Sequence, residues 1–560
     1  MEGITSMESK DDLQKIRIGA GEQLGAIPRV LKELQELVPL LSESYSTDGR
    51  TFGYEAPLSM SIPVGSYVAL SAQDGREYLG QIVTKEVSMR QGAEIGLELD
   101  PSLGALLPKG VNLSPSHTYP LQRRYAHGTG VILGRLDSGA CVPTTGEDGF
   151  QSADLSRAGE HLVGQYLSPS GRTTLEIGRA LHTDGRLRAR LRADGFDRHT
   201  FLCGQSGSGK TFALGVILER LLLETDLKIV ILDPNSDFVH LDRMRSLDEV
   251  NRTTSRELSP ESYEEVLARY QLVVPRLRIV RPAPYAENPS NLLRIRFSDL
   301  ERHEQGLVLD MDPLRDREEF NAYWRAIEAL SRDRYSLSQA KELVVGLLSE
   351  EARQLGLRME NLGVADWSLW SGADESSLID LLEEDWRCLV VDTGTLASPE
   401  EQSIVAMALL GHLWRHRHER QPVLIVVDEA HNICPQEPSD NLEAAVTSHA
   451  IKIAGEGRKF GIYLLVATQR PSKIHANVLS QCDNLILMKM NSTSDLERIS
   501  QIFSQAPATF LDQSPQFAQG ECLLAGKIVQ NPTFGGFEER FSEEGGTDVP
   551  TSWAASQKGV

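Results

Sequence analysis

A glycine-rich loop between an apolar stretch and a helical pattern carries the clearest chemistry of this chain. Residues 201–214 read FLCGQSGSGKTFAL and fit the phosphate-binding pattern GxxxxGK[ST]. In such a loop the peptide N–H groups close around phosphate oxygens, the lysine adds positive charge near the β and γ phosphates, and the threonine hydroxyl binds Mg²⁺. We therefore expect ATP and Mg²⁺ here. The expected nucleotide-binding residues are Gly204, Gln205, Ser206, Gly207, Ser208, Gly209, Lys210 and Thr211.

Two adjacent carboxylates follow a second apolar stretch, in the sequence VLIVVDEAH of residues 423–431. Hydrolysis of a phosphoanhydride needs one acid for the metal and one for the attacking water. We expect Asp428 to hold Mg²⁺ and Glu429 to orient and polarise the water. The alternative is that both acids only cap the helix that follows. His431 is interpreted as a helix-start residue and not as a catalytic group.

Four further side chains are candidates for supporting roles. Gln469 follows the apolar residues 463–467, where an amide can sense the γ-phosphate or satisfy a turn. Arg198 and Arg458 lie in loops beside core strands, and either could stabilise the transition state from a neighbouring subunit or be an ordinary surface arginine. Asp233, at the end of a strand, could support the metal or cap its loop.

Alternating strands and helices must position these residues, and this pattern favours an α/β fold with a parallel sheet. Ligands of such sheets bind at the carboxyl ends of the strands. The region between residues 233 and 388 looks mainly helical and is interpreted as an insertion. The expected core strands are 201–203, 228–232, 387–391, 423–427, 463–467 and 484–488.

The N-terminal third has a different pattern. Short apolar runs between residues 60 and 181, broken by Gly, Pro, Asn and Asp, predict a small β-barrel or sandwich that serves in assembly. Before it, residues 28–42 form an amphipathic helix that either docks a partner or caps its own domain. After it, RLRARLR (residues 186–192) places four arginines on one side of a strand, which faces either DNA, a partner or solvent.

Composition limits the remaining possibilities. The chain has 560 residues, more than one hydrophobic core, and its formal net charge of −22 argues against a surface that is basic all round. Any nucleic-acid site must therefore be local. The 6 cysteines form no CxxC pair, and no signal peptide or long apolar segment is recognisable. We expect a cytoplasmic protein without membrane contact.

Several motifs together resemble the HerA family of ring-forming DNA translocases, relatives of the FtsK motor. They read RHTFLCGQSGSGKT, ILDPNSDF, VVDEAHN, GEGRKFGIYLLVATQRPSKI and VLSQCDNLILMKM. The resemblance implies a homohexamer with a central channel for duplex DNA, built on a RecA-like P-loop ATPase core with an N-terminal β-barrel and a helical insertion. Gly455 stands where an arginine is common in the family, so the arginine acting between subunits rests on Arg458. The residues to which the resemblance assigns functional roles are Lys210, Thr211, Asp428, Glu429, Gln469, Arg198 and Arg458.

The resulting hypothesis is an ATP-hydrolysing hexameric DNA translocase or helicase that drives a nuclease or sirtuin-like effector, with bacterial antiphage defence as the favoured setting. DNA-end processing in repair is one alternative. A ring scaffold that gates a partner enzyme, with ATP as the switch, is the other. The expected domains are a helix region (1–50), a β-barrel (51–185), the ATPase core (186–245 and 386–535), a helical insertion (246–385) and a flexible tail (536–560).

Overall fold

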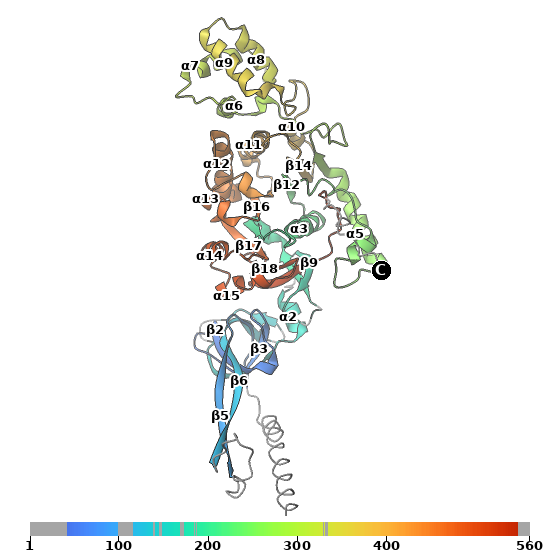
Figure 1. Ribbon diagram of the computed structural model, residues 1–560. Coiled ribbons are helices and arrows are strands. Elements are labelled where there is room, and N and C mark those ends of the chain that lie inside the picture. The colour runs from blue at the N-terminus through green and yellow to red at the C-terminus, as the bar shows by residue number, and fades with distance from the viewer. Residues whose placement is uncertain are drawn as a thin grey trace, which may run out of the picture. The chain divides into compact units, whose positions relative to one another are not determined.

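A computed structural model provides the structure of the chain (Figure 1). It describes residues 42–98, 116–137, 140–144, 148–167, 173–183, 185, 187–328, 330 and 334–546. The chain divides into two compact units between Val163 and Gly164, within helix α2 (Glu160–Leu167). The amphipathic helix expected at residues 28–42 lies, except for its last residue, outside the described residues.

The first unit is a closed barrel of six strands. Its strands follow one another in the order β2-β1-β8-β3-β4-β6, and antiparallel pairing of β2 with β6 closes the ring. Phe52, Val68, Leu70, Tyr78 and Leu155 pack inside it. The barrel alternative of the sequence prediction is therefore confirmed. The strands are β1 (Glu43–Ser46), β2 (Thr51–Pro57), β3 (Tyr67–Ala72), β4 (Glu77–Ile82), β6 (Ser116–Asp137) and β8 (Phe150–Arg157), with β5 (Glu86–Glu98) and β7 (Ala140–Val142) paired to β6.

The second unit is organised around an 11-stranded sheet in the order β10-β9-β19-β18-β17-β11-β16-β15-β12-β14-β13. The strands from β17 to β13 are parallel, and those from β17 to β10 pair antiparallel. The α/β fold with a parallel core is confirmed. The bounds are β9 (Thr174–Ala180), β10 (Arg188–Arg192), β11 (His199–Cys203), β12 (Lys228–Asp233), β13 (Leu277–Val280), β14 (Cys388–Asp392), β15 (Val423–Val427), β16 (Ile462–Thr468), β17 (Cys482–Met488), β18 (Glu521–Ala525) and β19 (Thr533–Phe537).

Helices cover both faces of the parallel strands. Figure 1 shows α3 (Lys210–Glu224) and α5 (Pro260–Val273) on one side of the sheet, and α12 (Asn441–Glu456), α13 (Ala476–Leu479) and α14 (Thr493–Ile502) on the other. This double cover explains why β11, β14 and β15 are buried at every position and read as continuous apolar runs. The other helices of the core are α4 (Leu247–Asn251), α11 (Pro399–Arg415) and α15 (Ala508–Leu511).

The helical insertion is confirmed, but it is shorter than expected. Within residues 246–385, helix α5 leads into β13, which pairs in parallel with β14 at the edge of the core sheet. This crossover belongs to the core, because its strand extends the same sheet. The insertion helices are α6 (Arg302–Val308), α7 (Arg317–Glu328), α8 (Leu337–Gly346), α9 (Glu350–Leu362) and α10 (Leu378–Glu383).

Two other expected boundaries are wrong. Strand β9 was expected in the barrel, yet it pairs with β10 and β19 of the large sheet. The expected tail begins inside β19, and its residues up to 546 are ordered against the core, where Arg540 is 0% and Phe541 1% exposed. Residues 547–560 lie outside the described part.

The RLRARLR segment supplies an edge strand whose charges are largely neutralised. Ala189 and Leu191 of β10 are buried, while Arg188 and Arg190 each form an ion pair with Glu176 of β9. From the sequence, these arginines were expected to face DNA, a partner or solvent, and their pairing with the neighbouring strand was not anticipated. Arg186 lies outside the described residues. Across the described ranges, no helix has the length and apolar character needed to cross a membrane.

Candidate functional site

The glycine-rich loop joins β11 to α3 and borders a pocket. Gly207 and Gly209 have φ angles of 76° and 92°, a region that favours glycine. The loop is fixed to its surroundings by hydrogen bonds from the Gln205 N–H to the Lys489 carbonyl and from the Gly520 N–H to the Ser208 carbonyl, both 2.9 Å. The pocket has a volume of about 500 Å³. Its lining includes Gln205, Ser206, Gly207, Gly209, Lys210, Thr211 and Gln469.

Sheet register brings the other candidate residues to the same edge. Strand β16 lies between β11 and β15, with Cys203 opposite Thr468 and Val427 opposite Val466. These strands run parallel, so the loops that follow them leave the sheet together. Asp428, Glu429 and Gln469 thereby meet the first turn of α3.

Lys210 is the centre of this cluster. Its ammonium Nζ contacts Asp428 Oδ1 and lies 3.2 Å from Glu429 Oε1. The lysine is only 5% exposed. Burial acts to lower its pKa, but the charges of the two carboxylates outweigh burial and raise the pKa of Lys210. The side chain is thus held as a cation beside the phosphate-binding loop.

Glu429 is held in a defined orientation by three side chains. Its Oε1 accepts a hydrogen bond of 3.0 Å from Gln469 Nε2, and its Oε2 lies 3.3 Å from Nδ1 of His431. Burial acts to raise the pKa of Glu429, but the contacts with His431, Lys210 and Gln469 lower it to about 2. The carboxylate is therefore ionised at neutral pH. Its backbone has a φ of 43°, an uncommon conformation outside glycine that places the side chain at the strand end.

His431 was expected only to start a helix. It lies in the short 3-10 helix η8 (Ala430–Asn432), and its Nδ1 is also 3.1 Å from Thr468 Oγ1. The ring therefore links the loop after β15 to the end of β16. The sequence offered one indication of this contact: His431 follows Glu429 by two residues, close enough for the two side chains to meet on a turn.

The side-chain oxygens of Thr211, Asp237 and Asp428 have the chemistry of magnesium ligands. Within the described part of the chain, the buried Asp428 Oδ2 has no hydrogen-bond partner. The Thr211 hydroxyl donates to Asp237 Oδ2 at 3.2 Å. Hydroxyl and carboxylate oxygens are the ligands that Mg²⁺ prefers. Asp237 was missed by sequence reasoning, because it follows its strand by a loop whose path the sequence does not reveal.

Asp233 caps its loop. Its carboxylate is fully buried and accepts hydrogen bonds from the N–H groups of Asp237 and Phe238, at 3.0 and 2.8 Å. Of the two roles considered for Asp233, the contacts favour the structural one. Burial raises the pKa of Asp233 to about 7 although these two N–H groups act to lower it.

The two candidate arginines are not brought to the pocket. Arg198 precedes β11 and Arg458 precedes β16, at the amino ends of strands whose carboxyl ends carry the site. Between Arg198 and Gly204 the chain runs as a strand, which at about 3.3 Å per residue separates them by about 20 Å. Both arginines contact Asp483 instead. Neither side chain can reach the pocket of its own chain.

Comparison with known proteins finds relatives among DNA repair helicases. A family model described as "Helicase HerA, central domain" matches residues 175–381. The DNA double-strand break repair helicase HerA of Sulfurisphaera tokodaii is 23% identical over 370 residues, covering 64% of this chain and 68% of the relative. The protein of the same name from Pyrococcus furiosus is 23% identical over 453 residues, covering 72% and 75%. The chain is a HerA-like ATPase.

Among solved structures, VirB4 of Thermoanaerobacter pseudethanolicus has a TM-score of 0.43 at 16% identity, covering 70% of this chain and 100% of that chain. The bacterial conjugative coupling protein TrwBdeltaN70 has a TM-score of 0.43 at 12% identity, covering 70% and 95%.

The pocket of the HerA-like ATPase extends well beyond the phosphate-binding loop. Sequence reasoning missed this part, because apart from Phe212 its residues lie far from the glycine-rich loop in the chain and carry no motif. They include Phe212, Thr253, Gln519, Gly520, Phe537 and Glu544. With the phosphates at the glycine-rich loop, these residues surround the space left for the rest of a nucleotide.

Proposed function

We propose that this HerA-like ATPase uses the hydrolysis of ATP to move along duplex DNA. The observation that carries the hydrolytic part is the cluster of Lys210, Asp428, Glu429 and Gln469 beside the glycine-rich loop. The DNA part is supported by the names of the two relatives, both DNA repair helicases.

In the proposed reaction, Lys210 exchanges its carboxylate partners for the β and γ phosphates. Glu429 is then free to accept a hydrogen bond from the attacking water, while Gln469 keeps the carboxylate in place and contacts the γ-phosphate. Thr211 and Asp428 would hold Mg²⁺, which neutralises phosphate charge. His431 and Gln469, which also lower the pKa of Glu429, keep their contacts when Lys210 leaves, so this side chain stays a carboxylate that can orient water.

We further propose that the protein works as a homohexameric ring around duplex DNA. Arg198 and Arg458 support this assembly, because both lie at the sheet edge opposite their own pocket. In a ring they would face the nucleotide of the next subunit and stabilise the transition state there.

The setting that we propose is antiphage defence with a nuclease or sirtuin-like effector, as the sequence resemblance suggests. The names of the relatives favour a second setting, repair of DNA double-strand breaks. Phage plaque counts and survival after double-strand breakage, each compared between the wild type and Glu429→Gln, separate the two. Protection from phage that is lost in the variant supports defence, whereas lost survival after breakage alone supports repair.

The first test is the steady-state ATPase rate with and without linear duplex DNA, together with the mass in solution. A hexamer whose hydrolysis rises strongly with DNA supports the translocase. A hexamer indifferent to DNA until an effector protein is added would instead indicate a gated scaffold, and a stable monomer would contradict the ring.

A further inference from the structure

The segment after β19 is bound tightly to the helix of the phosphate-binding loop. We call residues 538–546 the C-terminal strap. The Glu219 carboxylate of α3 is 0% exposed and accepts hydrogen bonds from the N–H groups of Phe541 and Ser542, at 2.9 and 2.7 Å. The Ser542 hydroxyl donates a third, at 2.5 Å. A buried carboxylate with three donors from one segment fixes that segment against the helix.

Arg540 of the strap reaches the first turn of α3. It is 0% exposed, and its Nη1 lies 3.3 Å from the Thr211 carbonyl and 3.1 Å from Glu544 Oε1. Gly215 makes this approach possible, because a Cβ atom there would lie 2.5 Å from Nε of Arg540. The guanidinium therefore joins the backbone of Thr211 to Glu544, and both residues line the nucleotide pocket.

A second connection leads from the strap to the same threonine. The Gly545 N–H donates to the Asp237 carbonyl at 3.0 Å, and the Asp237 carboxylate accepts the Thr211 hydroxyl at 3.2 Å. Thr211 is thus held at its carbonyl by Arg540 and at its hydroxyl by Asp237. The strap fixes both contacts.

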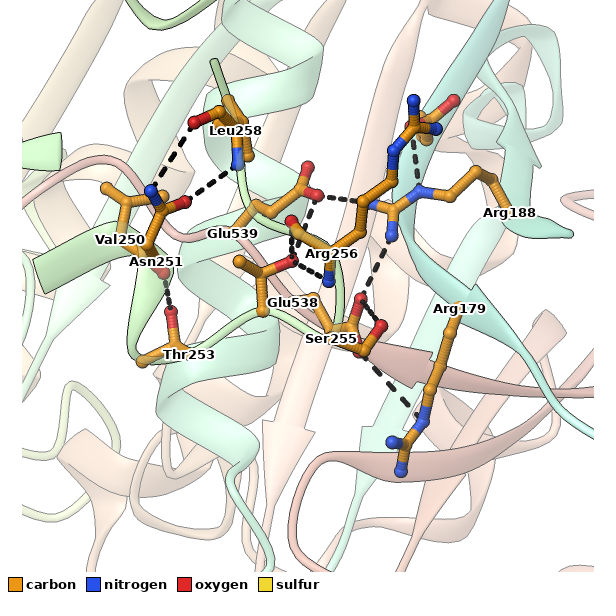
Figure 2. Close-up of polar contacts among 12 residues, drawn as sticks. Arg179, Arg188, Val250, Asn251, Thr253, Ser255, Arg256, Leu258, Glu538 and Glu539 are labelled. Atoms are coloured by element: carbon orange, nitrogen blue, oxygen red, sulfur yellow. Dashed lines mark hydrogen bonds and ion pairs between the residues drawn. The ribbon is translucent and has the colours of Figure 1, made fainter. Parts of the chain in front are cut away.

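The start of the strap is fixed independently. Glu538 accepts a hydrogen bond from Ser255 at 3.1 Å, and Arg188 forms ion pairs of 3.0 and 2.6 Å with Glu538 and Glu539 (Figure 2). Figure 2 shows these acidic side chains between the arginines of β9 and β10 and the loop around Ser255. Because both ends of the strap are fixed, its central arginine has a defined position relative to the pocket.

We propose that Arg540 is a positioning residue for the metal-bound nucleotide, acting through the Thr211 carbonyl and Glu544. Arg540 holds the first turn of α3 in the orientation in which the Thr211 hydroxyl can leave Asp237 and bind Mg²⁺. This inference rests on the proposed hydrolysis of Mg²⁺-ATP. It differs from a purely structural role, in which the buried arginine only adds to the stability of the fold.

Arg220 provides a matched control. It is another buried arginine, 7% exposed, on the same helix, and its Nη2 donates to the Glu539 carbonyl at 3.3 Å. Its Nε donates to the Glu176 carbonyl at 2.7 Å. Within the described residues it is not part of the pocket lining. Among the described residues, Arg220 contacts the start of the strap but neither Thr211 nor Glu544. Arg220→Gln therefore removes a buried arginine next to the strap and leaves the contacts of Arg540 with Thr211 and Glu544 in place.

The test compares Arg540→Gln with Arg220→Gln by binding of a fluorescent ATP analogue at increasing Mg²⁺ and by the Mg²⁺ dependence of the ATPase rate. We expect Arg540→Gln to raise the Mg²⁺ concentration for half-maximal binding by about tenfold or more, as for other groups that orient metal ligands. Arg220→Gln should leave it unchanged even where both variants lose similar thermal stability. Arg540→Lys should recover part of the loss.

Equal Mg²⁺ dependence in Arg540→Gln and Arg220→Gln would overturn the inference and leave a structural role. If Arg540→Gln does not fold, Glu544→Gln, which weakens the contact of Arg540 without emptying a buried position, must shift the Mg²⁺ dependence in the same direction. A direct contact of Glu544 with the nucleotide would instead change binding of the Mg²⁺-free analogue equally. If the wild type does not hydrolyse ATP, the proposed function itself is refuted. If the wild type hydrolyses ATP but Arg540→Gln and Arg220→Gln behave alike, only the inference about Arg540 fails.

Discussion

Arg458 donates a hydrogen bond to Asp483, with 2.5 Å between Nη1 and Oδ2. Arg198 lies 3.4 Å from the same oxygen. The shared carboxylate gathers both arginines at one place on the amino edge of the core sheet. Since this edge is remote from the pocket of the same chain, the pair can take part in hydrolysis only on another subunit.

Exchange of Arg458 tests this arrangement. Arg458→Ala should bind ATP normally and lose most hydrolysis, because the transition state loses a positive charge. Mixing Arg458→Ala with Glu429→Gln should restore part of the ATPase rate, since mixed rings contain pockets with both groups intact. Arg276→Ala removes an exposed arginine paired with Asp385 and serves as control. Failure of the mixture to recover any activity would argue against action across subunits.

Glu429→Gln should retain nucleotide and stop turnover. The amide keeps a hydrogen-bonding side chain beside Gln469 but removes the negative charge that orients water. We expect the ATPase rate to fall by about 10²- to 10⁴-fold, the range for groups of this kind, with little change in binding of a fluorescent ATP analogue. Glu419→Gln makes the same change at an exposed glutamate and serves as the control, which should keep the wild-type ATPase rate. An ATPase rate of Glu429→Gln close to that of the wild type would show that Glu429 does not have the proposed role.

Lys210→Met should abolish ATP binding and also destabilise the nucleotide-free protein. It leaves Asp428 and Glu429, 0% and 7% exposed, without their shared cation. Breaking a buried ion pair in this way costs about 3 kcal/mol. The double variant Lys210→Met/Asp428→Asn should recover a large part of the lost thermal stability. Equal melting temperatures for the wild type and the single variant would contradict the buried pairing.

The pKa of Asp233 predicts a pH-dependent stability. Burial raises it from the ordinary 3.8 to about 7, and Asp237 and Asp392 act in the same direction. Between pH 3.8 and about 7, Asp233 keeps its proton in the folded state but has lost it in the unfolded state. The contribution of Asp233 to the free energy of unfolding is therefore fully present below pH 3.8 and is lost as the pH rises through about 7. Thermal midpoints from about pH 5 to 8 should therefore fall less steeply in Asp233→Asn than in the wild type. The exposed Asp374→Asn should follow the wild type, and parallel profiles for all three would refute the assignment.

The elements next to the glycine-rich loop were predictable from local patterns. Residues 201–203 and 423–427 are buried on both sides, so each reads as an apolar run ending in polar residues. Because parallel strands share their carboxyl edge, the proximity of Asp428 to Lys210 followed from the expected sheet. The order of the strands in the sheet could not be predicted in this way, since neighbours such as β11 and β17 lie far apart in the chain.

What the sequence did not reveal depends on partners distant in the chain. Strand β13 has four residues, of which only Leu277 and Val280 are buried, too short to show a period within a helical region. The strap reads EERFSEEGG, which has the composition of a tail. Its buried charges face opposite charges from distant parts of the chain: Arg188 pairs with Glu538 and Glu539, and Glu219 lies 4.0 Å from Arg540. Side-chain contacts of Asp237 and His431 likewise depend on how the loops fold.

The central place of β11 also has a consequence for synthesis on the ribosome. The N–H of Leu464 donates to the His199 ring across 265 residues of sequence, and the neighbouring strand β17 comes later still. At a translation rate of about 5–20 residues per second, on the order of 10–50 s pass between the synthesis of the apolar β11 and that of the strands that pair with it. The nascent chain therefore needs protection from aggregation during that interval, and it can complete its nucleotide pocket only after Glu544, the last residue of the pocket lining in the sequence, has been synthesised.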